Sequence, residues 1–127
     1  MNRDTFKSWL DLYGAAWKTR DPKLIKKLFA DHAKYYEKPF ESPISGIASI
    51  TEYWSVIAQT QENVHFDYDI LAVDKKQGMA HWSASFVRKL TQTQVKLDGF
   101  FLVQLNSENK CTIFKEWWHS QKRKQVD

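Results

Sequence analysis

The chain has 127 residues, of which 43% are hydrophobic and 15% aromatic. This size and composition fit one folded domain with one core, and they exclude both a disordered chain and a second core. No apolar run approaches the roughly 20 residues that a membrane-spanning helix needs, and the first residues lack the pattern of a signal peptide. We therefore expect a cytoplasmic protein with no membrane partner.

Charge and cysteine content indicate which partners and bonds the protein can have. The net charge is +4, and part of the excess lies in a basic C-terminal tail, residues 122–127, which follows a single domain over residues 1–121. No basic stripe interleaved with aromatic residues follows one helix or strand, so we expect no nucleic-acid partner. Cys111 is the single cysteine, which excludes an internal disulfide, and we interpret it as a buried core thiol.

The first segments of the chain have helical spacing. From Asp4 to Arg20 apolar residues recur every three or four positions, which predicts a helix with one buried stripe. Asp21 and Pro22 are typical of a helix start and predict a short second helix. The apolar residues of the two helices are Phe6, Trp9, Leu10, Tyr13 and Trp17 in the first, and Leu24, Ile25, Leu28 and Phe29 in the second.

A brief extended segment and a third helix come next. The segment from Ala33 to Pro39 is expected to end at the proline, which cannot donate to a ladder. After a loop that ends near Gly46, helical spacing returns over residues 47–61, with Ser45 or Ser49 as the candidate N-cap.

From Val64 onward the chain alternates between apolar and polar residues. The alternation predicts four strands, over residues 64–73, 79–90, 95–105 and 111–119, joined by short polar turns. Three helices with one early strand, followed by a four-strand antiparallel meander, predict an α+β fold in which helices cover one side of a strongly curved sheet.

Two acids lie within the last two predicted strands. Because side chains alternate across a strand, Asp98 shares a face with Phe100, and Glu116 shares a face with Phe114 and Trp118. An acid among aromatic residues is costly unless it is paired, neutral or used, so we expect both acids to face an internal cavity.

The opposite face of this hairpin is more apolar than a solvated sheet surface should be. It consists of Val95, Leu97, Phe101, Val103, Leu105, Ile113 and Trp117. We therefore expect a homodimer that pairs through this face.

Several motifs resemble the nuclear transport factor 2-like superfamily, and within it the SnoaL-like (polyketide cyclase-like) branch. The matching pieces are residues 17–21, 28–31, 36–40, 46–50 with Tyr53 and Trp54, 97–99 and 115–118. The resemblance covers nearly the whole chain and implies a cone-shaped barrel, formed by a mostly antiparallel sheet and three N-terminal helices that enclose a pocket. Members include isomerases, cyclases, dehydratases, epoxide hydrolases and non-catalytic binding or dimerisation modules, so the resemblance specifies fold more than reaction.

Within this superfamily the chain partly resembles ketosteroid isomerase. The oxyanion tyrosine of that family corresponds to Tyr13, and its neutral, hydrogen-bond-donating aspartic acid corresponds to Asp98. The general base of that family corresponds to Lys38, which is not an acid, and a shift of the strand by one residue presents Glu37 instead. Limonene epoxide hydrolase offers a weaker match, in which Tyr35 and Glu116 are kept but the charged pair of the middle strand is missing from residues 79–85.

The other candidate site residues are inferred from the side of the predicted strand or helix on which they lie. His81 shares a face with Ser83 and Ser85, and this face is either the cavity, which gives a histidine acid or base, or the outer sheet surface. The expected ligand-binding residues are Trp17, Tyr35, Lys38, Trp54, Phe100, Phe114 and Trp118. No glycine-rich phosphate loop or metal-ligand spacing occurs, so we expect no cofactor and no metal.

Two functions remain open from the sequence. The first is a domain that binds a small apolar or aromatic ligand and performs cofactor-free acid/base chemistry of the isomerase or cyclase type, with Tyr13, Asp98, Glu116, Glu37 or His81 as catalytic residues. The second is a binding or dimerisation module with the same cavity and no turnover.

Overall fold

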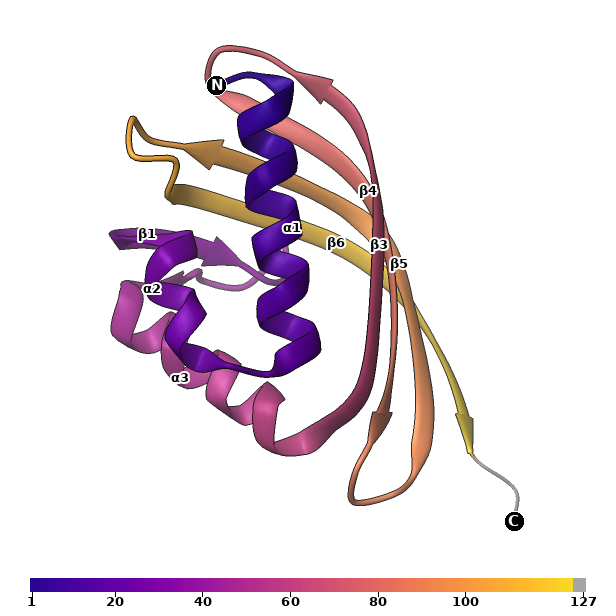
Figure 1. The fold of residues 1–127 in the computed structure, drawn as a ribbon. Helices are drawn as coiled ribbons and strands as arrows, with labels where there is room; N and C mark the ends of the chain where they lie inside the picture. Colours follow the sequence, from indigo (N-terminus) through magenta and orange to yellow (C-terminus); the bar gives the residue numbers. More distant parts are fainter. Residues whose placement is uncertain (125–127) are drawn as a thin grey trace.

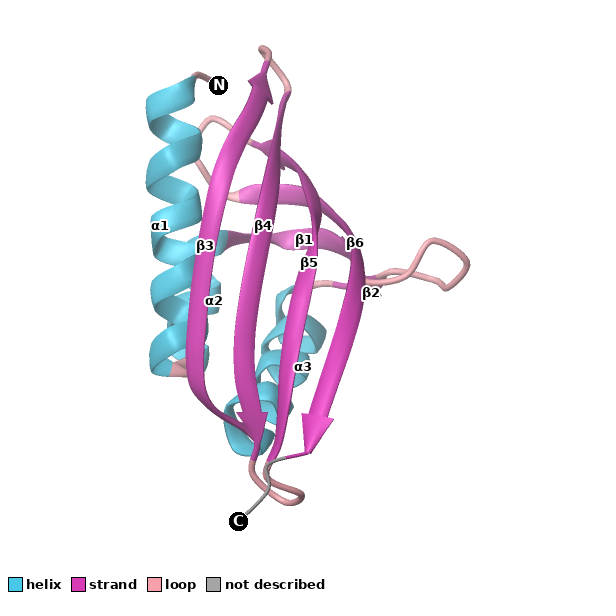
Figure 2. Ribbon diagram, turned by 90° about the vertical axis from the view of Figure 1, so that its right-hand side faces the viewer, coloured by secondary structure: helices cyan, strands magenta, loops and turns pink. Residues whose placement is uncertain are grey.

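The computed structural model describes residues 1–124, which form three helices, a 3₁₀ turn and one six-stranded sheet. The helices gather on one face of the sheet, and the long strands curve around them (Figures 1 and 2). The predicted α+β architecture with a strongly curved, mostly antiparallel sheet is therefore confirmed. The sheet does not close into a complete barrel, because β2 and β3 remain as its two edges.

Helix α1, Arg3–Thr19, has the predicted buried stripe, from Phe6 to Trp17. Its start is fixed by a capping box in which the Asn2 side chain accepts a hydrogen bond from the Thr5 backbone N–H, while the Thr5 side chain bonds back to Asn2. No helix in the described part of the chain is long and apolar enough to cross a membrane.

The second helix is shorter than predicted. Residues Pro22–Leu24 form a 3₁₀ turn, and α2 occupies only Ile25–Leu28. Phe29, expected on the helix, begins strand β1, Phe29–Tyr36, which ends before Pro39. The strand starts early because Phe29 pairs with Cys111 of β6 and its ring is buried in the core. Cys111 is itself fully buried, as predicted.

Neither serine caps helix α3, Ile47–Thr60. Ser45 belongs to the short strand β2, Ile44–Ser45, which the sequence analysis missed, and the N-cap is Gly46 without a side-chain hydrogen bond. Gly46 has φ +87°, a conformation that glycine adopts readily and other residues rarely do. Its N–H donates to the carbonyl of Ala33 (2.9 Å), so the turn connects α3 to β1.

The four long strands are β3, Gln61–Val73, β4, Gln77–Arg88, β5, Thr93–Leu105, and β6, Cys111–Lys124. The sheet order is β2-β1-β6-β5-β4-β3, and β1 pairs with β6 in parallel while all other pairs are antiparallel. Strand β6 continues beyond the predicted His119, so that Lys122 and Arg123 lie in the strand; residues 125–127 lie outside the described part.

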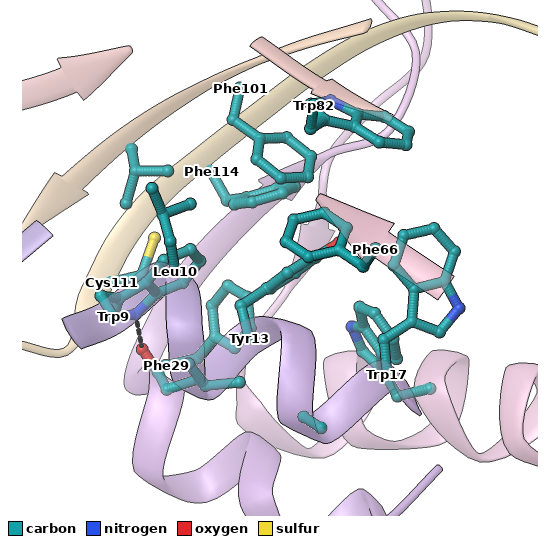
Figure 3. Packing of buried hydrophobic residues seen from close by; sticks show 14 of the residues in the cluster. Trp9, Leu10, Tyr13, Trp17, Phe29, Phe66, Trp82, Phe101, Cys111 and Phe114 are labelled. Carbon is teal, nitrogen blue, oxygen red and sulfur yellow. Dashed lines mark hydrogen bonds between the residues drawn. The ribbon is translucent and has the colours of Figure 1, made fainter. Parts of the chain in front are cut away.

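The core is built mainly of aromatic rings between α1 and the sheet (Figure 3). Tyr13 is at its centre. Its ring stacks on Trp9 and Phe114 at centroid distances of 5.4 and 5.6 Å, and its edge meets Phe101 at 5.1 Å. The indole N–H of Trp9 donates to the carbonyl of Leu28 (2.9 Å), which ties α1 to α2. These contacts fix α1 over the sheet.

Candidate functional site

A cavity of about 350 Å³ lies between α1, α3 and the inner face of the sheet. Eight residues that the sequence singles out line it: Tyr13, Trp17, Tyr35, Glu37, Lys38, Trp54, Glu116 and Trp118. Its volume is at the lower end of the usual range for small-molecule sites, and its lining combines aromatic rings with polar and charged side chains.

The cavity opens along the second half of β6. Strand β1 ends at Tyr36, opposite Lys115, so from Glu116 onward β6 pairs with β5 alone. Helix α3 faces this opening through Tyr53 and Ile57, which are half-buried and line the cavity. A ligand can therefore enter between α3 and the free edge of β6.

Glu116 is the buried acid of the cavity, with 8% of its surface exposed. It lies opposite Phe101 of β5, and Phe114 and Trp118 flank it on the same face of β6. Burial raises the pKa of the Glu116 carboxyl well above its usual range, and the nearby charge of Glu37 raises it further. Both effects favour the protonated carboxyl, which can donate as well as accept a hydrogen bond.

Two buried tyrosines extend this acid into a polar cluster. The hydroxyl of Tyr35 donates to Oε1 of Glu116 at 3.4 Å, and the Tyr35 ring stacks on Phe114 with centroids 4.5 Å apart. Burial raises the pKa of both Tyr35 and Tyr13, and the negative charge that Glu116 carries when ionised adds to the effect. The hydroxyls therefore stay protonated and are available as donors.

Glu37 and Lys38 both line the cavity, so the sequence alternative between them is not exclusive. They follow the end of β1 at Tyr36, so their side chains do not have to point to opposite faces of the sheet as successive residues of a strand do. Glu37 is half-buried and Lys38 is exposed. Glu37 is therefore the acid at the rim of the cavity, and Glu116 is the acid in its interior.

Asp98 does not face the cavity. Its side chain is 66% exposed on the outer face of the sheet, where Oδ1 lies 2.9 Å from Nε2 of His81. The expected pairing of Tyr13 with Asp98 is wrong, because Tyr13 lies in the core on the other side of β5. The Asp98 side chain therefore remains in contact with water.

His81 and Phe100 share the outer face with Asp98. The ring of Phe100 is 5.5 Å from that of His81 and 45% exposed, so neither residue lines the cavity. Phe114 is fully buried behind Tyr35 and supports the site without lining it.

The surface predicted for a homodimer also has the wrong orientation. Val95, Phe101 and Val103 point into the core. Of that predicted face only Trp117 is strongly exposed, at 44%, and it lies on the outer face of the sheet.

Several residues of the cavity were not predicted. They include Tyr53, Ile57, Gln61, Trp82, Phe86, Arg88, Leu97, Ser120 and Lys122. Tyr53 and Ile57 continue the stripe of Ile50 and Trp54 on α3, and Trp82 and Phe86 alternate with His81, so the periodicity contained a signal for these four. Arg88 continues the alternation of Trp82 and Phe86, and Lys122 continues that of Glu116 and Trp118, but a charged residue near a strand end gives no sign that it lines a cavity.

Two indole N–H groups at the cavity have no hydrogen-bond partner among the described residues. They belong to Trp54 and Trp82, both of which are buried. Of the other two indoles at the cavity, that of Trp17 donates to Oε1 of Gln61 at 2.8 Å. The indole nitrogen atoms of Trp54 and Trp82 are both shielded from solvent, so each is an unpaired buried donor, which is costly.

The described residues contain no group of three or more His, Cys, Asp or Glu that could hold a metal ion. The outer face of the sheet has an open hollow of about 470 Å³, lined by Ser83, Ser85, Asp98 and other residues. No deeply buried acid or tyrosine within residues 1–124 lines this hollow. A further hollow of about 550 Å³ has Glu116, Glu37 and Asp98 in its lining but no tyrosine. The buried acid and the buried tyrosines meet in the inner cavity, so we assign the candidate site to it.

The curved sheet, the three helices and the enclosed acid define the chain as a cone-shaped α+β domain of the nuclear transport factor 2-like type. The sequence profile of the SnoaL-like domain matches residues 10–112, and the chain belongs to this family. No curated protein matches the chain.

Three solved structures are similar in fold. The epoxide hydrolase/cyclase-like enzyme SalBIII, which has a role in pyran ring formation in the polyether salinomycin, has a TM-score of 0.77 at 20% identity, over 89% of each chain. A putative isomerase from Bacillus subtilis has a TM-score of 0.80 at 13% identity, over 94% of this chain and 90% of that one. A computationally designed 17-OHP binder has a TM-score of 0.79 at 15% identity, over 92% and 96%. At these identities the likeness shows the fold alone.

Proposed function

We propose that the cavity binds a small apolar or aromatic molecule that carries a carbonyl or similar acceptor, and that Glu116 and Glu37 move a proton on it without a cofactor. The observation that carries this proposal is the pairing of two acids in unlike surroundings. Burial raises the pKa of Glu116, whereas Glu37 stands at the rim. A buried acid and a second acid at the rim of the same cavity suit the roles of proton donor and proton acceptor.

The chemistry follows from these positions. The protonated carboxyl of Glu116 donates a hydrogen bond to the carbonyl oxygen of the ligand, with the hydroxyls of Tyr35 and Tyr13 close by. The carboxylate of Glu37 takes a proton from the carbon next to that carbonyl. The electron pair of the broken C–H bond forms a C=C bond, the π pair of the carbonyl moves to the oxygen, and the oxygen takes the proton of Glu116, which gives an enol. When the proton on Glu37 has exchanged with solvent, its return to the same carbon gives isotope exchange, and its return to another carbon of a conjugated ligand gives isomerisation.

The second candidate is a binding module with the same cavity and no turnover. A specific observation favours it: Lys38 stands where the resembling isomerases have their base, and Asp98 lies outside the cavity. The constellation of ketosteroid isomerase is therefore incomplete. The two candidates differ only in whether proton transfer takes place once the ligand is bound.

Hydrogen exchange separates these candidates. We would incubate the protein in D₂O with aromatic ketones such as 1-tetralone, and follow deuterium incorporation next to the carbonyl by mass spectrometry. We expect exchange above the buffer rate that is lost in Glu116→Gln and in Glu37→Gln. The matched control is Glu52→Gln, at an exposed position of α3 away from the cavity.

Ligand binding is measured in the same samples from the indole resonance of Trp54. Ketones that shift this resonance without faster exchange would assign the protein to the binding module. Ketones that neither bind nor exchange would contradict both candidates.

We further propose that the protein is a cytoplasmic homodimer that pairs through the outer face of the sheet, not through the face first expected. Met79, Phe100 and Trp117 are each at least 40% exposed there, and aromatic side chains are enriched at protein interfaces. Sedimentation equilibrium at tens of micromolar is expected to give twice the 15.0 kDa of one chain, and Trp117→Glu is expected to give monomers. A wild-type monomer would refute this proposal.

A further inference from the structure

Two basic side chains at the open end of the cavity have no ion-pair partner within residues 1–124. Arg88 ends β4, and Lys122 lies near the end of β6; both line the cavity and are exposed. Neither takes part in a salt bridge among the described residues. An exposed cation can remain in water at little cost, so the lack of a partner does not by itself indicate a binding site. It indicates one only if these side chains point into the cavity.

The register of the sheet gives this direction. Val95 of β5 pairs with Phe86 of β4 on one side and with Lys122 of β6 on the other. Directly paired residues point to the same face of a sheet, so Lys122 emerges on the cavity side with Phe86 and Val95. Two residues beyond Phe86, Arg88 emerges on the same face, with Cζ 5.5 Å from the centroid of the Phe86 ring. The guanidinium is therefore held over a wall of the cavity.

The two ends of the cavity differ in charge. Lys122 lies six residues after Glu116, which corresponds to about 20 Å along an extended strand. Glu116 and Glu37 occupy the end near β1, and Arg88 and Lys122 occupy the end near the β4–β5 hairpin. At the first end the positive charge of Lys38 offsets the negative charge of its neighbour Glu37, whereas two cations and, among the described residues, no acid line the second end, which therefore attracts an anion. The cavity thus gives an elongated anionic ligand one favourable orientation.

We propose that the ligand of this site is an amphiphilic carboxylic acid, with an aromatic or apolar body between Trp54 and Trp82 and a carboxylate between Arg88 and Lys122. The planar guanidinium of Arg88 suits a carboxylate, which it can bind with two parallel hydrogen bonds. This inference rests on the proposed function, because it names the class of molecule that the same cavity takes. It adds a requirement for negative charge at the end opposite Glu116.

The test compares two probes of nearly equal shape, 1-naphthaleneacetate and its neutral amide, 1-naphthaleneacetamide. Dissociation constants are measured from the indole N–H resonances of ¹⁵N-labelled protein. We expect both probes to shift the signals of Trp54 and Trp82, and the acetate to bind about threefold to tenfold more tightly at low salt. This advantage should shrink as the ionic strength rises, because the two cations are exposed.

Two variants test whether Arg88 and Lys122 are the positive charges that bind the acetate. Arg88→Gln and, independently, Lys122→Gln are each expected to weaken acetate binding about twofold to fivefold and to leave amide binding unchanged. The matched control is Lys26→Gln, which removes one exposed positive charge on α2 away from the cavity. Two separate variants are used so that a folding defect in one does not decide the result.

The outcomes are distinct. Equal affinity for the two probes, or a loss in Lys26→Gln as large as in Arg88→Gln and Lys122→Gln, would overturn the inference and leave the proposed function standing. Binding that shifts Trp117 on the outer face, and not Trp54 or Trp82, would overturn both. No binding of either probe would also overturn both, because the proposed function requires the cavity to accept aromatic molecules.

Discussion

The hydroxyl of Tyr35 on β1 donates a hydrogen bond to Oε1 of Glu116 on β6, across 81 positions of the sequence. The two strands are parallel neighbours, and Tyr35 pairs with Phe114, so its side chain reaches forward to the next inward residue of β6. The length of this bond, 3.4 Å, makes it weak. Glu116 is thus a buried acid with little compensation for the loss of water.

We expect Glu116→Gln to gain stability relative to the wild type as the pH rises. The pKa of Glu116 is raised in the folded state, so above its ordinary pKa the unfolded chain loses a proton that the folded protein keeps. The wild type therefore loses up to about 1.4 kcal/mol of stability per pH unit, until the pH passes the folded-state pKa. Urea unfolding of both proteins from pH 4 to 9 measures this. A constant difference between them across that range would contradict the buried-acid interpretation.

Tyr35→Phe is expected to raise the pKa of Glu116 further, because the hydroxyl of Tyr35 stabilises the ionised form. The pKa can be followed by ¹³C NMR of the glutamate carboxyl. The variant should also lose less than about 1 kcal/mol of stability, because this bond is longer than the usual hydrogen bond of that net value. Tyr36→Phe is the matched control, since Tyr36 points to the other face of β1, where its ring lies 5.1 Å from Nζ of Lys115. A downward shift in Tyr35→Phe would refute the assignment.

Asp98→Asn is expected to fold normally and to bind the two naphthalene probes as the wild type does. Its contact with His81 lies in solvent, and such a pair contributes at most about 1 kcal/mol. Binding and thermal unfolding of the variant are to be compared with those of Glu116→Gln. A large loss of ligand affinity in Asp98→Asn alone would return this residue to the site and contradict the structure.

Gly99→Ala is expected to destabilise the protein by about 2 to 3 kcal/mol or to prevent folding. A Cβ atom at Gly99 would overlap the carbonyl oxygen of Trp117, where β5 approaches β6 closely. The backbone, unlike a side chain, cannot turn aside. Thermal unfolding of the variant measures the loss, and Ser85→Ala, a change of similar size at a half-buried position of β4, serves as the control. Equal melting temperatures would show that the strands can separate at Gly99.

The sequence was sufficient for the helices and the long strands because their periodicity extends over many residues. The sequence was also sufficient to predict that Glu116 points to the same face of its strand as Phe114 and Trp118. On this strand Lys115 and the exposed Trp117 alternate with these three residues. The prediction from sequence failed at Asp98 because the two faces of β5 are equally apolar. One face has Phe100 and Leu102, and the other has Phe101 and Val103. Alternation then gives two sets of residues but does not say which set faces inward.

Other errors have a different physical origin. Strand β2 has only two residues and exists through its pairing with Lys34 and Tyr35, which no local pattern reveals. The early start of β1 at Phe29 depends on a partner, Cys111, at the far end of the chain. Arg88 and Lys122 share the cavity only through the register of three strands. Contacts between distant segments determine each of these features, and a single sequence does not display them.

The parallel pairing of β1 with β6 has a consequence for biosynthesis. A ribosome releases the chain from its N-terminus, so Phe29 and Tyr35 emerge well before Cys111 and Phe114, the residues with which they pair. Until β6 is complete, the apolar sides of α1 and β1 lack the strand that connects them to the meander. The wall that contains Glu116 is therefore the last part of the cavity to be synthesised, and nascent chains halted before this strand should be substrates for chaperones rather than proteins able to bind a ligand.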